Sequence, residues 1–340
     1  MSEPIPVLIA LPAPVPEEIV TRVREVSPRL QVEVRHAASL ADLSAELATT
    51  EVFLTSLKLP DAKQAPRLRW VQAYSAGVEG WLATAGDRLN EVALTTASGV
   101  HGPVMAEASL MMMLAWSHAL PQMMAHQARH SWPADRYKVF APAELRGATL
   151  GIVGYGSIGR ETARLACAMG MRVLACKRNP QQRPDPGWTV PGTGDPSGEL
   201  PERYFGIEQL NDMLAECDSV LLTLALTPAT RHIIDKAALR HMKPSAVLVN
   251  VARGGLVDEP ALIEALQTGV IRAAGLDVFE TEPLPADSPL WDLPNALLMP
   301  HISGFTPAYD ERLLTLFAEN LRRYLAGEPL LNRVDPAAGY

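Results

Sequence analysis

Residues 148–159 read ATLGIVGYGSIG, the stretch that indicates the fold most clearly. The apolar run Leu150–Val153 is typical of a buried strand. It leads into glycines with the spacing G-x-G-x-x-G: Gly154, Gly156 and Gly159. The next residues, RETARLACAMG, place small apolar side chains at helical spacing. Strand, glycine loop and helix in this order predict a dinucleotide-binding turn, in which the glycines let a pyrophosphate approach the helix N-terminus.

Strand-like and helix-like segments alternate on both sides of the glycine loop. Before the loop, strands are predicted at 6–11, 32–37, 51–56, 69–75 and 92–97, with a helix at 16–27. After the loop, strands are predicted at 171–176, 219–226, 246–252, 271–279 and 296–301. This alternation predicts an α/β fold with two Rossmann-like or flavodoxin-like domains, each built on a parallel sheet.

The length of 340 residues is more than one core usually holds, which also predicts two domains. A helix predicted at about 307–326 would return the chain to the first domain. We therefore expect a discontinuous substrate-binding domain, residues 1–103 with 307–340, and an NAD(P)-binding Rossmann domain at 104–306. The active site is expected in the cleft between the two domains.

The composition is that of an ordinary globular protein, with 48% hydrophobic and 20% charged residues. A net charge of −8 and a pI near 5.5 argue against nucleic acid or an anionic membrane as the main partner. The N-terminus has no basic stretch before its short apolar run, and the apolar run at 110–116 is too short to cross a bilayer. We expect a cytoplasmic protein.

The three cysteines, Cys167, Cys176 and Cys217, cannot all pair and show no metal-ligand spacing. We interpret them as reduced core residues, and a catalytic thiol is the less favoured alternative. We expect no metal site.

Three short motifs in the second half of the chain carry chemistry. They read NVARGGLVDE (250–259), AGLDVFETEP (274–283) and MPHISG (299–304), and they supply Arg253, Glu282 and His301. A guanidinium can hold a carboxylate through two hydrogen bonds, and a histidine oriented by a carboxylate can exchange a proton with a hydroxyl at neutral pH. This set suits hydride transfer on a 2-hydroxy or 2-oxo acid.

The order and spacing of these motifs resemble the D-isomer-specific 2-hydroxyacid dehydrogenases. SAGVEG (75–80), ASGVHGPVMAEASL (97–110) and LTPATRHIID (226–235) extend the resemblance over nearly the whole chain. The resemblance implies that Arg253 holds the substrate carboxylate with help from the backbone amides of Ala76 and Gly77. It implies that His301, charged beside Glu282, donates a proton while the nicotinamide delivers hydride.

The same resemblance assigns the remaining binding residues. Ser157 and Ile158 would lie over the pyrophosphate and Leu224 near the adenine. Residues beside the ribose and nicotinamide would be Val251, Ala252, Asp277 and Gly304. Asp277 needs hydrogen-bond donors, which a carboxamide can supply, and a structural Asp satisfied by the chain is the alternative. Tyr74 is expected in the substrate pocket, with core packing as its alternative.

Cofactor preference depends on the end of the strand after the glycine loop. NAD-binding domains usually place an acid there for the ribose hydroxyls, whereas this chain has Lys177 and Arg178. Because two cations can neutralise a 2′-phosphate, NADP(H) is favoured over NAD(H), and two solvated surface bases are the alternative. The sequence then continues with a Pro/Gly-rich insertion, residues 179–204. We expect it to be a surface loop near the adenosine end of the cofactor.

A long helix is predicted from Pro103 to about Arg129, with Met and Leu on most faces. Such a helix is buried, and the family resemblance implies a homodimer interface in the 104–130 region. Two other function classes stay open. One is a phosphite or formate dehydrogenase, although formate dehydrogenases place Gln where Glu282 stands. The other is a dinucleotide-sensing protein like the corepressors that share this fold. The D stereochemistry rests on the family alone.

Overall fold

The computed structural model describes residues 3–11 and 13–337, which divide into two compact units. Unit 1 takes the chain up to Val100, Pro186–Val190 and the chain from Thr306 onward, and unit 2 takes His101–Asp185 and Pro191–Phe305. The segment Pro186–Val190 was not expected in unit 1. It belongs there because the Trp188 amide donates to Oδ1 of Asn332, at 3.1 Å.

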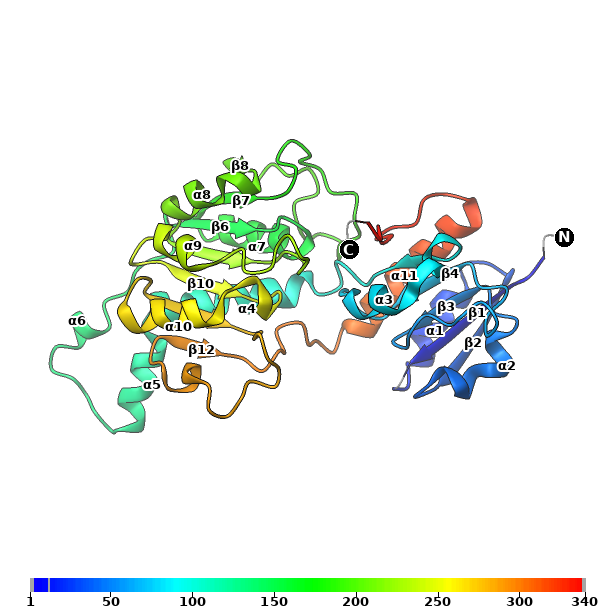
Figure 1. Ribbon diagram of the computed structural model, residues 1–340, viewed down its shortest axis with the longest axis horizontal. Helices are drawn as coiled ribbons and strands as arrows, with labels where there is room; N and C mark the ends of the chain where they lie inside the picture. The colour runs from blue at the N-terminus through cyan, green and yellow to red at the C-terminus, as the bar shows by residue number, and fades with distance from the viewer. Residues whose placement is uncertain (1–2, 12, 338–340) are drawn as a thin grey trace. The chain divides into compact units, whose positions relative to one another are not determined.

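Unit 1 is built on a five-stranded parallel sheet with strand order β2-β1-β3-β4-β5 (Figure 1). The strands are β1 Ile5–Leu11, β2 Leu30–His36, β3 Val52–Thr55, β4 Trp70–Ala73 and β5 Ala93–Thr95. The helices are α1 Glu17–Arg24, α2 Ser44–Leu47, α3 Glu79–Ala85 and α11 Tyr309–Ala326. The return of the chain in α11 makes this unit discontinuous.

Successive residues of β1 enter different cores, as the two-residue period of a strand requires. Val7 and Ile9 pack in the cluster that contains the α11 residue Phe317, and Leu8 packs in the cluster that contains Leu47 of α2. Both faces of this sheet are therefore covered, which explains why β1 and β3 read as nearly continuous apolar runs.

Unit 2 contains a seven-stranded parallel sheet of order β12-β11-β10-β9-β6-β7-β8. Its strands are β6 Thr149–Val153, β7 Arg172–Cys176, β8 Arg203–Phe205, β9 Ser219–Leu222, β10 Val247–Asn250, β11 Ala273–Leu276 and β12 Ala296–Leu298. Its helices are α4 Gly102–Ser117, α5 Leu120–Ala128, α6 Arg136–Val139, α7 Ser157–Ala168, α8 Leu210–Glu216, α9 Lys236–His241 and α10 Glu259–Thr268.

Helices cover both faces of this sheet (Figure 1). On one face α8, α9 and α10 pack on residues such as Leu248, and on the other α4 and α7 pack on residues such as Val249. In a parallel sheet all strands end at the same edge, so the loops after β6, β7, β10, β11 and β12 emerge together, where such sheets bind ligands.

One sequence prediction was wrong in detail. The helix expected over 103–129 is interrupted at Ala119, which has a left-handed φ of 53°. Pro121 lies in the first turn of α5, and a proline there has no N–H with which to continue the preceding helix. The 179–204 insertion is a surface loop over most of its length, as expected, but Asp195 is buried within it and its last residues enter β8.

No helix among the described residues is long and apolar enough to cross a membrane. In the same part of the chain, no group of three or more His, Cys, Asp or Glu side chains is arranged to hold a metal ion.

Candidate functional site

The glycine loop closes the end of β6 tightly against its neighbours. Gly154 has φ +96°, and a Cβ there would lie 2.6 Å from the Leu224 amide nitrogen. A Cβ on Gly159 would lie 2.7 Å from the Gly154 carbonyl oxygen, whereas a Cβ on Gly156 would meet nothing within 4 Å. Two glycines thus permit close backbone packing, and the third leaves open space at the start of α7. This cradle fits a pyrophosphate bound at a helix N-terminus.

Lys177 lies beside the glycine loop because β6 and β7 are neighbours. The Gly154 amide donates to the carbonyl of Cys176, the last residue of β7, at 2.8 Å. The Lys177 ammonium donates to the Gln182 carbonyl at 2.6 Å. Burial, followed by the charge of Arg160, lowers the pKa of Lys177, and the carboxylate of Asp185 opposes this shift. The carboxyl ends of β6 and β7, here called the β6–β7 edge, thus carry the glycine cradle and a half-buried cation.

The other predicted loop residues lie near these groups. Ser157 and Ile158 form the first turn of α7, and Leu224 follows β9 and contacts Gly154. Arg178 is exposed and follows Lys177. Val251 and Ala252 are buried just after β10, and the Val251 side chain belongs to the core shared with α4 and α7.

Arg253 follows β10 and is held by contacts with the residues just before it in the chain. The Asn250 side-chain amide donates to the Arg253 carbonyl at 2.9 Å, and the Arg253 guanidinium donates to the Ala252 carbonyl at 2.8 Å. A Cβ on Gly254 would lie 1.9 Å from the Phe279 carbonyl carbon, so only glycine lets the two loops approach this closely. Asn250 is a positioning residue that the sequence analysis missed, although a polar residue ending an apolar run is a usable signal.

Asp277 fixes the loop that carries His301. It is 1% exposed, and its two carboxylate oxygens accept the amides of Ile302 at 2.8 Å and Ser303 at 3.0 Å. The His301 amide in turn donates to the Asp277 carbonyl at 2.9 Å. The chain itself therefore supplies the donors that we assigned to the cofactor's carboxamide. This geometry fits the structural alternative for Asp277.

His301 and Glu282 form a close pair. Nδ1 of His301 lies 2.6 Å from Oε2 of Glu282, and the other carboxylate oxygen accepts the Phe279 amide at 3.0 Å. The side chains are 50% and 35% exposed, so the pair is open to solvent. Burial acts to raise the pKa of Glu282, but the hydrogen bonds from His301 and Phe279 and the charges of His301 and Arg253 lower it overall. A carboxylate that accepts from Nδ1 leaves Nε2 for another partner.

Gly304 contacts His101, to which the sequence analysis assigned no role. Nδ1 of His101 lies 3.0 Å from the Gly304 carbonyl oxygen, which can only accept, so Nδ1 donates. A Cβ on Gly304 would lie 3.0 Å from the same ring nitrogen. His101 thus supports the loop after His301, and nothing in its sequence context indicated this contact.

The carboxyl ends of β10, β11 and β12, here called the β10–β12 edge, carry Arg253 and His301.

The predicted substrate residues Tyr74, Ala76 and Gly77 lie in unit 1, after β4. The Tyr74 hydroxyl donates to Asp310 of α11 at 2.9 Å, and the Tyr309 hydroxyl donates to the Tyr74 carbonyl. Tyr74 is therefore held in the unit by α11, as its packing alternative requires. Within the described residues, the amides of Ala76 and Gly77 make no hydrogen bond. Their role in binding a carboxylate stays a prediction.

The three thiols are unsuited to nucleophilic catalysis. Cys176 and Cys217 are buried, and burial raises the pKa of each to about 12. Burial also raises the pKa of Cys167. Since the thiolate is the reactive form, these side chains are inert at neutral pH.

A family model described as D-isomer specific 2-hydroxyacid dehydrogenase, NAD binding domain, matches residues 110–303, more than half of the chain. A glyoxylate/hydroxypyruvate reductase B of Pectobacterium atrosepticum is 35% identical over 278 residues, which cover 81% of each chain. A D-3-phosphoglycerate dehydrogenase of Methanocaldococcus jannaschii is 32% identical over 333 residues, 97% of this chain and 59% of that one. The chain spans about half to three fifths of the phosphoglycerate dehydrogenases that it matches.

Solved structures agree with this fold. A D-isomer specific 2-hydroxyacid dehydrogenase from Xanthobacter autotrophicus, in complex with NADPH and MES, has a TM-score of 0.79 and 29% identity and covers 100% of both chains. An NADPH-dependent glyoxylate/hydroxypyruvate reductase from Sinorhizobium meliloti, in complex with NADP and sulfate, has a TM-score of 0.77 and 27% identity, over 99% of this chain and 100% of that one.

Proposed function

This chain belongs to the family of D-isomer specific 2-hydroxyacid dehydrogenases, and on that premise we propose that it is an NADPH-dependent reductase of small 2-oxo acids. The reaction converts a 2-oxo acid, NADPH and a proton into a 2-hydroxy acid and NADP⁺. The observation that carries the proposal is the His301–Glu282 pair on the same sheet edge as Arg253. The D configuration of the product follows from the family.

The glycine cradle is the proposed site for the pyrophosphate. Gly156 leaves open space in front of the first turn of α7, whose amides and partial positive charge favour an anion. Ser157 and Ile158 supply that first turn, and Leu224 closes the side next to Gly154. When bound, the dinucleotide supplies the hydride for C2 of the substrate.

His301 is the proposed proton donor. Nδ1 donates to the Glu282 carboxylate, which fixes the ring and stabilises the charged imidazole, and Nε2 then gives its proton to the 2-oxo oxygen. Glu282 is suited to this role because its pKa is lowered, so it stays ionised at neutral pH. The backbone contacts of Asp277 hold His301 at its left-handed φ of 54°.

Arg253 is the proposed carboxylate ligand. A guanidinium matches a carboxylate in shape and charge and polarises the adjacent 2-oxo group. The contacts of Asn250 and Gly254 fix the backbone from which its side chain extends. A net charge of −8 gives the protein no long-range attraction for an anionic substrate, so a fixed local cation is required.

NADPH is proposed over NADH because Lys177 stands where an acid would bind the ribose hydroxyls. Its ammonium is half-buried and beside the glycine loop, where a 2′-phosphate would neutralise it. Arg178 follows it at the surface. The two solved relatives described above are in complex with NADPH and with NADP, which agrees with this preference.

A homodimer is proposed through α4 and α5. Apolar side chains on these helices are exposed to an unusual degree, with Met111 at 46%, Leu120 at 46% and Met124 at 60%. Met111 and Leu120 line an apolar hollow together with Met123 and Met169, and Met124 is exposed on the same helix as Leu120. A contiguous apolar surface of this kind is typical of an interface. Sedimentation equilibrium would test it: Met124→Glu should give a monomer, and a wild-type monomer at assay concentration would contradict the proposal.

Consumption of NADPH with glyoxylate, hydroxypyruvate and phenylpyruvate tests the proposed activity. We expect turnover with at least one of these acids and higher kcat/KM with NADPH than with NADH. NADPH or NADH binding without turnover of any 2-oxo acid would favour a dinucleotide-sensing protein instead. Reduction of NADP⁺ or NAD⁺ by phosphite or formate alone would favour the other dehydrogenase class.

A further inference from the structure

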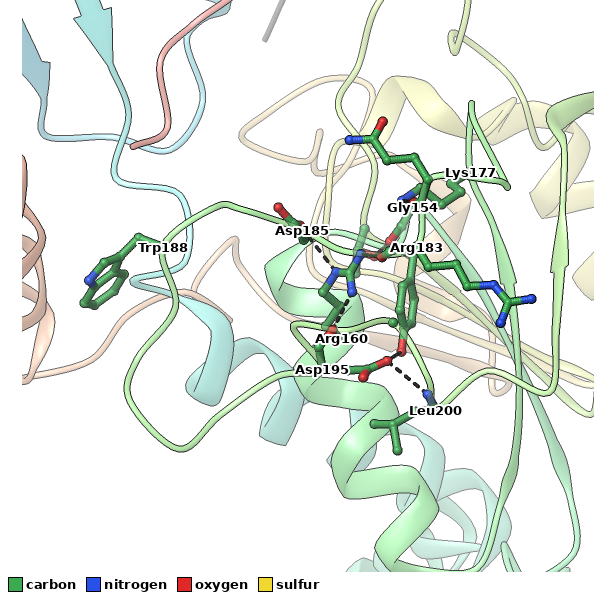
Figure 2. Close-up of polar contacts among 12 residues, drawn as sticks. Gly154, Arg160, Lys177, Arg183, Asp185, Trp188, Asp195 and Leu200 are labelled. Carbon is green, nitrogen blue, oxygen red and sulfur yellow. Dashed lines mark hydrogen bonds and ion pairs between the residues drawn. The ribbon is translucent and has the colours of Figure 1, made fainter. Parts of the chain in front are cut away.

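Arg160, the residue after the last glycine of the loop, is a buried cation that binds the 179–204 insertion. It is 1% exposed. Its Nη2 donates to the Arg183 carbonyl at 2.7 Å, its Nη1 donates to the Asp195 carbonyl, and its Nε lies 3.3 Å from the Asp185 carboxylate. Figure 2 shows this guanidinium reaching two separate stretches of the insertion. A buried charge with these partners fixes a geometry that a free surface loop would not keep.

The side chains next to Arg160 bind the second stretch of the insertion. The Tyr155 hydroxyl, within the glycine loop, donates to the Asp195 carboxylate at 2.8 Å, and that carboxylate also accepts the Leu200 amide at 3.1 Å. Glu161 accepts the Gly194 amide at 2.6 Å. The two stretches of the insertion that belong to unit 2, up to Asp185 and from Pro191, are therefore folded onto the loop and helix that would hold the cofactor's pyrophosphate.

The two stretches are also joined to each other. The Asp185 amide donates to the Pro196 carbonyl at 3.1 Å. A Cβ on Gly198, which has φ +71°, would lie 2.4 Å from the Arg183 carbonyl oxygen. Only glycine therefore lets this part of the insertion approach the carbonyl that Arg160 binds.

The series of contacts that begins at Arg160 reaches Lys177 through the insertion. The carbonyl that accepts its ammonium belongs to Gln182, the residue before Arg183. Arg160 thus holds one peptide of the insertion, and the peptide next to it holds Lys177. Figure 2 shows Lys177, Gly154 and Arg183 gathered above Arg160.

We propose that the 179–204 insertion, fixed by Arg160, is a specificity element that positions Lys177 for the 2′-phosphate of NADP(H). This inference rests on the proposed function. A lysine side chain carries about 2 kcal/mol of rotamer entropy, and holding it in place before the ligand arrives removes part of that cost from binding. On binding, the phosphate replaces the Gln182 carbonyl as the partner of the ammonium. Arg160, Asp195 and Gly198 are positioning residues in this account.

Two glycines of the insertion give a matched pair of variants. Gly198 and Gly192 both have a left-handed φ, +71° and +80°. An alanine would therefore cause similar backbone strain at either position. A Cβ at Gly192 meets nothing within 4 Å, whereas at Gly198 it meets the Arg183 carbonyl. Gly198→Ala therefore displaces the peptide next to Gln182 without changing any charge, and Gly192→Ala leaves it in place.

Calorimetric titration with 2′,5′-ADP and with 5′-AMP measures the contribution of the 2′-phosphate without turnover. We expect the wild type to prefer 2′,5′-ADP, and Lys177→Ala to lose most of that preference. Gly198→Ala should lower the preference about tenfold, which is about 1.4 kcal/mol, with 5′-AMP affinity kept within about twofold. Gly192→Ala should retain it. If Gly198→Ala does not fold, Arg160→Lys replaces it, since lysine keeps the charge but cannot bind two carbonyls and a carboxylate together.

The outcomes separate the two proposals. A wild type without preference for 2′,5′-ADP overturns the NADP(H) assignment and this inference with it. A preference that Lys177→Ala abolishes and the insertion variant retains overturns the positioning role alone, and the NADP(H) assignment stands. Equal losses in Gly198→Ala and Gly192→Ala would also overturn it, because the effect would then come from loop strain rather than from the Arg183 contact.

Discussion

The β10–β12 edge and the β6–β7 edge belong to one sheet, yet they fix their functional side chains by different means. At the β10–β12 edge, contacts between neighbouring loops do so: Asn250 holds the backbone of Arg253, and Asp277 holds that of His301. At the β6–β7 edge, Lys177 is held by an insertion that returns to the sheet only at β8. Local motifs thus define the proposed reacting groups, whereas contacts made by the folded insertion define the cation proposed for the cofactor.

The largest expected effect is at the β10–β12 edge. His301→Ala removes the proposed proton donor, and kcat for 2-oxo acid reduction should fall on the order of 10³-fold. The dissociation constant for NADPH should stay within about twofold, since the β6–β7 edge is untouched. Steady-state kinetics with fluorescence titration of NADPH checks both. Wild-type turnover in this variant would remove His301 from the mechanism.

Arg253→Lys should have the next largest effect. The charge is kept, but the two parallel hydrogen bonds to a carboxylate are lost, so kcat/KM for the 2-oxo acid should fall on the order of 10²-fold. The fall in kcat/KM should appear mainly with substrates that carry a carboxylate. A variant that loses NADPH affinity instead would place Arg253 in cofactor binding.

Lys177→Ala tests the other edge. The ratio of kcat/KM for NADPH to that for NADH should fall about 30-fold, because one charge-assisted contact to phosphate is worth about 2 kcal/mol. The value for NADH should change little. Equal falls in kcat/KM with both cofactors would mean that Lys177 supports the fold rather than binding the 2′-phosphate.

Glu282→Gln should give the smallest change in rate, and the size of that change depends on pH. The neutral amide lacks the negative charge that faces Nδ1 of His301, so reduction should fall about tenfold at neutral pH. The pKa of Glu282 is lowered in the folded protein. The effect of its negative charge on the rate of reduction is therefore present above the ordinary carboxyl pKa and is lost as pH falls through the lowered value. The pH–rate profiles of the two proteins should converge there. A constant ratio across pH would argue against a charge effect.

The contrast between the two edges also explains which parts of the fold and the site could be predicted from the sequence. Strand positions, two sheets and the placement of Arg253 and His301 follow from apolar runs and short motifs, because residues at strand ends inherit their position from the sheet. The break at Ala119 was missed although Pro121 signals it. The contacts that anchor the insertion were missed for a different reason, since Arg160, Asp185 and Asp195 meet only after the loop folds back on α7.

Deuteride transfer tests the central claim most directly. NADPH deuterated at the reactive C4 position is mixed with hydroxypyruvate or phenylpyruvate, whichever has the higher kcat/KM, because both give a chiral 2-hydroxy acid. The product is examined by mass spectrometry after chiral separation. The account predicts a D-2-hydroxy acid with one deuterium at C2 from the wild type, and on the order of 10³-fold slower formation in His301→Ala. A product without deuterium at C2, or no product from any 2-oxo acid, would contradict it.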